Sequence, residues 1–282
     1  MALATDKIGT AYGGDATQVV DPEQAKAYAA ATNDDNTAYE SGKYAPPVFA
    51  VAPTWGVMGL AVADVVPADA MLMVVHGEQD MHFHRPVVPG MTLRTRSEPF
   101  SVRVGGSGTR YTIRVRSDDE EGTPIVEQYV TMFIRGMTDG ESAGADKPDH
   151  TFPEDARAAL VGEFGVHVDD DQTYRYSKAS GDMMPIHLDA DIAKSVGLPG
   201  IIAHGLCTMA MCSQAVLKTV AGGDPARLKR LAVRFAANVF PGNDVVTRIH
   251  DAGERDGLRV YAFEAESAGA TVIKNGLAEV EA

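Results

Sequence analysis

The chain has 282 residues, of which 45% are hydrophobic and 23% are charged, a composition typical of a folded globular protein. Its 39 acidic and 25 basic residues give a formal net charge of −14, which disfavours binding to nucleic acid or to an anionic membrane surface. No run of 18 apolar residues occurs, and residues 1–14 lack the apolar stretch of a secretory signal. We therefore expect a cytoplasmic protein of about two domains, with no nucleic-acid partner and no membrane span.

The first half of the chain is repeated in the second half. Residues 28–34 match residues 176–182, with Tyr, Ala and Asp shared at an offset of 148. Residues 82–90 match residues 234–242, with Phe, Val, Pro and Gly shared at an offset of 152. Matched order over about 100 residues favours an internal duplication with four extra residues in the second copy.

In chain order, the first copy contains a helix around Trp55 and Met58, followed by strands. Apolar and polar residues alternate over 110–116, which predicts a half-buried strand, and residues 125–134 supply the next one. Residues 105–108 are interpreted as a hairpin turn. A stretch rich in Gly, Asp, Glu and Pro then predicts a linker, so the predicted division is an N-terminal unit at 1–137, a linker at 138–155 and a C-terminal unit at 156–282.

The second copy repeats this order. Asp189 is a predicted N-cap for a short helix over 190–196. Residues 204–220 are apolar on nearly every face, which predicts a helix enclosed by other structure and containing the two buried, unpaired cysteines Cys207 and Cys212. Residues 258–266 and 271–280 predict closing strands. A helix enclosed by an antiparallel sheet in each copy gives an α+β fold.

The polar groups of the second copy gather around a bend. Pro185 interrupts any helix between Asp182 and His187, so the backbone turns and the two side chains converge. Gly205 follows at the start of the enclosed helix, where the first N–H groups lack partners. A carboxylate, an imidazole and a helix-terminal amide suit the addition of water to an α,β-unsaturated thioester, in which the amide binds the enolate oxygen.

Each of these residues also has a plain structural interpretation. Asp182 would cap a turn, His187 would be a buried and hydrogen-bonded histidine, and Gly205 would be glycine for close packing. For His204 we favour the structural role, in which the ring bonds to the backbone.

Residues 176–211 also resemble a known motif. The pattern Tyr-x3-Ser-Gly-Asp-x2-Pro-Ile-His-x-Asp, followed by Ala-His-Gly-Leu, is similar to the hydratase 2 motif of the MaoC-like dehydratases, which are (R)-specific enoyl-CoA hydratases with the hot-dog fold. The resemblance implies a tandem, double hot-dog protein that hydrates trans-2-enoyl-CoA to (R)-3-hydroxyacyl-CoA. It implies Asp182 as the base, His187 as the acid for the α-carbon and Gly205 N–H as the donor to the thioester carbonyl.

Two further details follow from the resemblance. Ser213 matches a position that lines the substrate pocket, and Met183–Met184 depart from the family, whose members often have Asn before the Pro. No metal or redox cofactor is expected, because water addition passes no electrons to an acceptor, and coenzyme A enters only as part of the substrate.

The first copy lacks most of this machinery. Asp34 occupies the position of Asp182, but the residues that deliver a histidine are missing. Pro53 occupies the position of Gly205, and proline has no N–H to donate. We therefore predict one active site per chain, in the C-terminal unit.

The densest basic cluster of this acidic chain is Arg227, Lys229 and Arg230. We expect it to meet the phosphates of the acyl-CoA substrate, with Lys178 and Lys194 as other options and a solvated loop as the structural alternative. His76, His82 and His84 are residues of a type that binds metals, but no clustered carboxylate or cysteine completes a set, so we expect no metal site.

Three other functions fit the same sequence features. The nearest alternative is dehydration of a 3-hydroxyacyl group on acyl carrier protein, although an acidic carrier would find this acidic surface unattractive. A non-catalytic acyl-thioester-binding module and thioester hydrolysis on the same fold are the others. Pairing of chains into a homodimer is a further expectation that the sequence does not decide.

Overall fold

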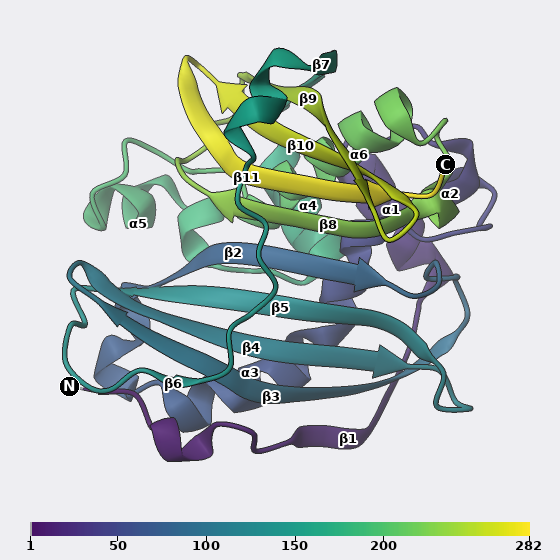
Figure 1. The fold of residues 1–282 in the computed structure, drawn as a ribbon. Coiled ribbons are helices and arrows are strands. Elements are labelled where there is room, and N and C mark those ends of the chain that lie inside the picture. The colour runs from purple at the N-terminus through teal and green to yellow at the C-terminus, as the bar shows by residue number, and fades with distance from the viewer. Residues whose placement is uncertain (1) are drawn as a thin grey trace.

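A computed structural model describes residues 2–282, and it divides into two units of matching architecture (Figure 1). The N-terminal unit contains strands β1 (Tyr12–Val19), β2 (Val74–Phe83), β3 (Thr92–Gly105), β4 (Gly108–Asp118) and β5 (Pro124–Arg135), with helices α1 (Pro22–Ala31), α2 (Thr37–Glu40) and α3 (Trp55–Val65). The C-terminal unit contains strands β7 (Leu160–His167), β8 (Leu228–Phe235), β9 (Asp244–Arg255), β10 (Leu258–Ser267) and β11 (Ala270–Val280), with helices α4 (Gln172–Ser180), α5 (Ala190–Ser195) and α6 (Gly205–Val220).

The strands of both units form one continuous antiparallel sheet. Its order is β1-β3-β4-β5-β2-β8-β11-β10-β9-β7, and the short β6 (Ala143–Gly144) pairs with β3 outside this path. The second half of the order mirrors the first, with β2 and β8 forming the seam between the units. This mirrored order confirms the predicted duplication and the predicted α+β class.

The two copies also meet through their first helices. Helix α1 packs against α4, and the hydroxyls of Tyr28 and Tyr176 hydrogen-bond at 3.0 Å across the interface. These two tyrosines are the residues that the repeat places at an offset of 148, so the contact joins equivalent points of the two units.

Helix α6 forms the core of the C-terminal unit. Every residue from Leu206 to Leu217 is buried, which confirms the predicted enclosed helix. The chain leaves this helix through Gly222 and Gly223, both at positive φ, and Gly223 N–H donates to the Leu217 carbonyl at 2.8 Å. Asp189 caps α5 as predicted, because its side chain accepts from the N–H groups of Asp191 and Ile192.

Helix α3 is the counterpart of α6 and packs against β3. With the preceding 3-10 turn η2 (Pro47–Thr54), it forms the segment Pro47–Val65, whose 19 residues and mean hydropathy of 1.6 would by length and composition alone allow a membrane crossing. Most of that segment is buried in the protein, as expected for the core helix of a folded domain, so it is weak evidence for a span.

The predicted strands are confirmed at β4, β5, β10 and β11, and the predicted turn at 105–108 joins β3 to β4. The chain between β5 and β7 crosses in front of the sheet, whereas α3 lies behind it (Figure 1). Arg103 holds this connection by donating to the carbonyls of Ala143 and Gly144 at 2.7 and 3.1 Å. The exact limits of the predicted linker stay a prediction.

Candidate active site

The Asp182 turn, residues 180–187, begins where helix α4 ends. Gly181 adopts a φ of 80°, in the left-handed region that favours glycine, and its N–H donates to the Ser177 carbonyl at 2.9 Å. Asp182 N–H donates to Ser180 Oγ at 3.2 Å, and Asp182 Oδ1 accepts the N–H of Met184 at 3.1 Å. These bonds fix the partly exposed Asp182 carboxylate at the head of the turn.

His187 closes the turn as the last residue of the 3-10 helix η5 (Pro185–His187), and it is buried. Its Nδ1 hydrogen-bonds to the Ile202 carbonyl at 2.7 Å. A carbonyl oxygen can only accept, so Nδ1 carries the proton in the neutral ring. The other nitrogen, Nε2, is therefore left with a lone pair that can accept a proton.

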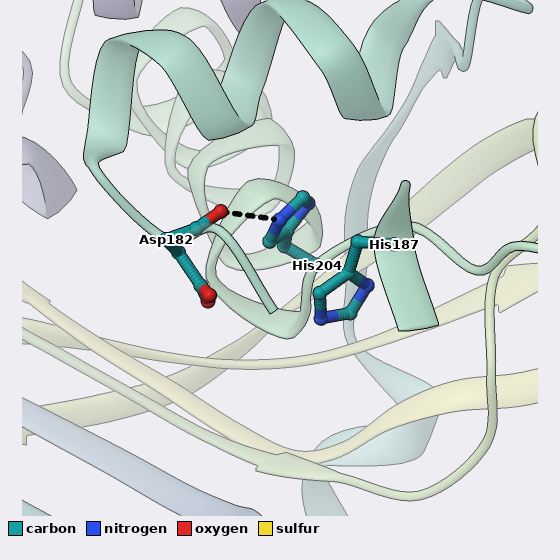
Figure 2. A group of neighbouring side chains, drawn as sticks. All are labelled: Asp182, His187 and His204. Carbon is teal, nitrogen blue, oxygen red and sulfur yellow. Dashed lines mark hydrogen bonds between the residues drawn. The ribbon is translucent and has the colours of Figure 1, made fainter. Parts of the chain in front are cut away.

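The predicted convergence of the two side chains is confirmed. One oxygen of Asp182 and one ring nitrogen from each of His187 and His204 lie within 4.8 Å of one another. Figure 2 shows the Asp182 carboxylate and the His187 ring on the same side of the turn. A water making two hydrogen bonds of about 2.8 Å at a tetrahedral angle joins atoms about 4.5 Å apart, so this spacing suits one bridging water.

His204 ties the two ends of the turn together. Its Nε2 lies 3.2 Å from the Asp182 carbonyl, the bond drawn in Figure 2, and 3.1 Å from Ser177 Oγ. Its ring stacks on the His187 ring with centroids 3.7 Å apart and planes inclined by 27°. The expected bond from His204 to the backbone is thus confirmed, and the ring also supports His187.

Burial sets the charge state of both imidazoles. It lowers the pKa of His187 below the usual value, although the bond to Ile202 and the Asp182 charge act in the opposite direction. Burial, together with the neighbouring His187, lowers the pKa of His204 to about 3. Both rings are therefore neutral at neutral pH.

Gly205 is the first residue of α6, directly after His204. Thr208 N–H donates to the His204 carbonyl at 3.1 Å, so the amides of the three residues before it have no acceptor within the helix. They lie at the positive end of the helix dipole, beside the histidine pair. A side chain on Gly205 would place its Cβ 3.2 Å from the Phe235 ring. Close packing against Phe235 therefore favours glycine here.

Comparison with known proteins agrees with this geometry. Residues 154–271 match the MaoC like domain, and residues 30–136 match the MFE-2 hydratase 2 N-terminal domain. A crystal structure of a MaoC-like dehydratase from Phytophthora capsici superimposes with a TM-score of 0.83 at 28% identity, covering 98% of both chains. The chain belongs to the MaoC-like dehydratase family.

The sequence similarity of curated relatives covers most of this MaoC-like chain. A probable enoyl-CoA hydratase 2 of Dictyostelium discoideum is 28% identical over 83% of this chain and 81% of its own length. The peroxisomal multifunctional enzyme type 2 of Drosophila melanogaster is 31% identical over 68% of this chain, which spans only 32% of that longer protein. Family membership and the double hot-dog fold thus confirm the resemblance seen in the motif.

One residue of the basic cluster, Arg230, is buried, so the prediction that it meets the phosphates of acyl-CoA was wrong. Arg230 is 4% exposed and donates to both carboxylate oxygens of Asp80, at 2.9 and 2.8 Å. Its Nη2 also donates to the Asp149 carbonyl at 2.9 Å. A guanidinium held by a buried carboxylate at the seam has no free face for a ligand.

Arg227 and Lys229 turn toward the end of the chain. Arg227 donates to the Glu281 carbonyl at 3.0 and 2.6 Å, and Lys229 Nζ lies 2.9 Å from Glu281 Oε1. Arg227 directly precedes β8 and Lys229 is its second residue, whereas Phe235 at the other end of the strand packs against Gly205. A strand rises about 3.3 Å per residue, so about 20 Å or more separates them from the site. Their contact with coenzyme A stays a prediction.

Ser213 lies in α6, two turns beyond Gly205, and is 3% exposed. Its hydroxyl has no hydrogen-bond partner within residues 2–282. A buried hydroxyl without a partner is unusual in a folded protein. A pocket-lining role for Ser213 stays a prediction.

The first copy has an equivalent turn, but no histidine follows it. Asn33 takes the left-handed conformation, at φ 54°, that Gly181 takes in the second copy, and Asp34 follows it. Burial raises the pKa of Asp34 to about 6. The next element is α2 instead of a turn with a histidine, and Pro53 lies inside η2, ahead of α3. A single active site per chain stays a prediction.

His76 and His82, two of the three histidines considered as metal ligands, have structural partners. His82 Nε2 lies 3.2 Å from Asp80 Oδ1, and the His76 ring packs against the Phe235 ring with centroids 4.9 Å apart. Across residues 2–282, the group of three close potential metal ligands is Asp182, His187 and His204. In that group, one nitrogen of each ring already bonds to protein oxygen atoms.

Two contributors to the site were missed from the sequence. The Ile202 carbonyl fixes the proton on His187, and Ser177 Oγ lies against His204. A backbone carbonyl leaves no mark in a residue pattern. Ser177 does fall within the motif, shortly before Asp182. A helical projection of residues 172–180 would have placed it on the buried face of α4.

Proposed function

We propose that the chain is an (R)-specific enoyl-CoA hydratase, which reversibly adds water to trans-2-enoyl-CoA to give (R)-3-hydroxyacyl-CoA. The observation that carries this proposal is the carboxylate and neutral imidazole within 4.8 Å of each other at the start of the enclosed helix. The names of relatives as enoyl-CoA hydratase 2 support the substrate class, and the (R) outcome rests on the family.

The resting state of His187 suggests the order of proton transfers. Asp182 and His187 Nε2 hold one water, and Nε2 takes a water proton as the oxygen bonds to C3 of the enoyl group. The electrons of the double bond move onto the thioester oxygen, where Gly205 N–H and the helix dipole stabilise the negative charge. The Asp182 carboxylate stabilises the imidazolium, which then returns the proton to the α-carbon.

This order differs from the assignment that the resemblance implied. If Asp182 were the base and His187 the initial acid, His187 would have to start as an imidazolium. Burial disfavours that form by lowering the pKa of His187. The neutral ring with a proton on Nδ1 instead begins as an acceptor.

The pH profile tests this assignment. The neutral form of His187 is present above its lowered pKa and is lost as the pH falls through that value. We therefore expect kcat/KM to be level from about pH 7 to about pH 8 and to fall in acid. If kcat/KM instead falls as the pH rises above about 6, His187 must start protonated.

The activity itself is tested by the loss of enoyl absorbance from crotonyl-CoA, followed by longer and branched enoyl-CoAs. We expect steady turnover and an (R)-3-hydroxyacyl product by chiral analysis. Measurable binding without turnover of any of these thioesters would favour the non-catalytic module. Faster turnover of crotonyl groups on acyl carrier protein would favour the dehydratase alternative, although the net charge of −14 makes an acidic carrier the weaker partner.

The reaction is proposed to need no resident metal or redox cofactor. A carboxylate and two imidazoles can hold a divalent ion; in the proposed reaction the nitrogen of His187 that is free of protein hydrogen bonds, Nε2, binds the water instead. We expect dialysis against EDTA to leave kcat within about twofold of its starting value. Loss of activity that one divalent cation restores would assign a metal to this site.

Compartment and assembly stay proposals. We expected a cytoplasmic protein, but relatives from Arabidopsis thaliana and Drosophila melanogaster are named as peroxisomal enzymes. Imaging of the tagged full chain in its own cell decides the compartment. Sedimentation of the purified chain decides whether it forms the proposed homodimer.

A further inference from the structure

We propose that the N-terminal, non-catalytic unit positions the Asp182 turn through Gln24 and Trp55, which makes Trp55 a positioning residue for the reaction. The inference rests on the proposed hydratase function. It assigns to the degenerate copy a direct part in turnover, beyond completing the sheet.

Gln24 makes the first of the two contacts. It lies in α1, and its Nε2 donates to the Ala179 carbonyl in the last turn of α4 at 2.9 Å. The contact has a mirror image, because Gln172 Nε2 donates to the Ala31 carbonyl at the end of α1. Gln172 lies 148 residues after Gln24, and Ala179 lies 148 residues after Ala31, so the two bonds are equivalent in the repeat. The glutamines therefore brace the two turns symmetrically.

Trp55 breaks that symmetry. It is the first residue of α3, and its indole Nε1 donates to the Ser180 carbonyl at 3.0 Å. Its ring also lies beside Gly181, where an added Cβ would be 4.0 Å from Trp55 Cδ1. The residue that the offset of 152 places opposite Trp55 is Cys207, which has no N–H on its side chain. Only the turn that bears Asp182 has an indole donor from the other copy.

Gln24 and Trp55 bind the end of α4, where a small shift of the backbone would also shift the Asp182 carboxylate. The carbonyls of the last turn of a helix have no partner within it, so donors from outside define its end. Ser180 is also joined to Asp182 through the bond from Asp182 N–H to Ser180 Oγ. Movement of the Ser180 backbone would therefore move the Asp182 carboxylate relative to His187. A misplacement of about 1 Å in a catalytic group can cost about 100-fold in rate.

The test compares Trp55→Phe and Gln24→Ala with Gln172→Ala as the matched control. Trp55→Phe keeps an aromatic ring but removes the N–H, and Gln24→Ala removes the second donor. Each is expected to lower kcat for crotonyl-CoA by about 3- to 10-fold while KM stays within about twofold. Gln172→Ala removes the mirror-image bond at the non-catalytic turn, and it is expected to leave kcat within about twofold.

Thermal unfolding of all three variants separates positioning from stability. If kcat falls only in proportion to lost stability, or if Gln172→Ala lowers kcat as much as Trp55→Phe, the positioning role is overturned. A Gln24→Glu variant sharpens the result, because a carboxylate would face the Ala179 carbonyl and should lower kcat further than alanine does. Inactive wild-type protein would contradict the hydratase proposal, whereas active wild type with unaffected variants would contradict only this inference.

Discussion

Replacing Asp182 by asparagine is expected to lower kcat for crotonyl-CoA by about 10²- to 10³-fold, the usual loss when one preorganised group that stabilises developing charge is removed. Asparagine keeps an oxygen that can accept the Met184 N–H, so the turn should retain its shape. What is lost is the negative charge that orients the water and stabilises the imidazolium form of His187. KM should change little, because the carboxylate acts on the water and not on the body of the thioester.

Asp34→Asn provides the matched control, since Asp34 follows a left-handed residue at the head of the equivalent turn of the first copy. We expect it to leave kcat within about twofold, because α2 follows it where the second copy has His187. A loss at Asp34 as deep as the loss at Asp182 would contradict the assignment of one active site per chain. Equal and near-normal activity in both variants would remove the carboxylate from the mechanism.

Much of this architecture could be predicted because duplication and periodicity are visible in the sequence. Alternation in β4 and all-round apolarity in α6 reflect burial on one face and on every face, which are direct consequences of their places in the core. The bend at Pro185 predicted that Asp182 and His187 converge, because a proline disfavours an α-helix that continues through it. Local rules were sufficient for these elements.

The errors arose where a residue's neighbours come from a distant part of the chain. The sequence shows one basic cluster of Arg227, Lys229 and Arg230. Side chains alternate along β8, so that Arg230 lies at the seam and binds Asp80 of β2. Trp55 was predicted only as part of a helix in the first copy, and its bond to the Ser180 carbonyl spans 125 residues. Pairing of strands and of copies decides such contacts, and neither composition nor spacing encodes it.

The buried pair of Asp80 and Arg230 should therefore matter for stability instead of substrate binding. Burial alone would raise the pKa of Asp80, but hydrogen bonds from His82 and Arg230 outweigh it and hold that pKa well below its usual range. The stabilisation is fully present above the ordinary carboxyl pKa and is lost only as the pH falls through the lowered value. At neutral pH the pair is charged, and each member depends on the other.

Arg230→Met is thus expected to lower the free energy of unfolding by about 3–5 kcal/mol, because it leaves a carboxylate that is 1% exposed without its main partner. The midpoint of urea unfolding measures this loss, with Lys229→Met at a more exposed neighbouring position as the control, expected to lose no more than about 1 kcal/mol. Adding Asp80→Leu to Arg230→Met should recover much of the stability, since apolar residues can replace a buried ion pair at little net cost. A raised KM for acyl-CoA with unchanged unfolding would instead return Arg230 to the phosphate-binding role that its sequence position first suggested.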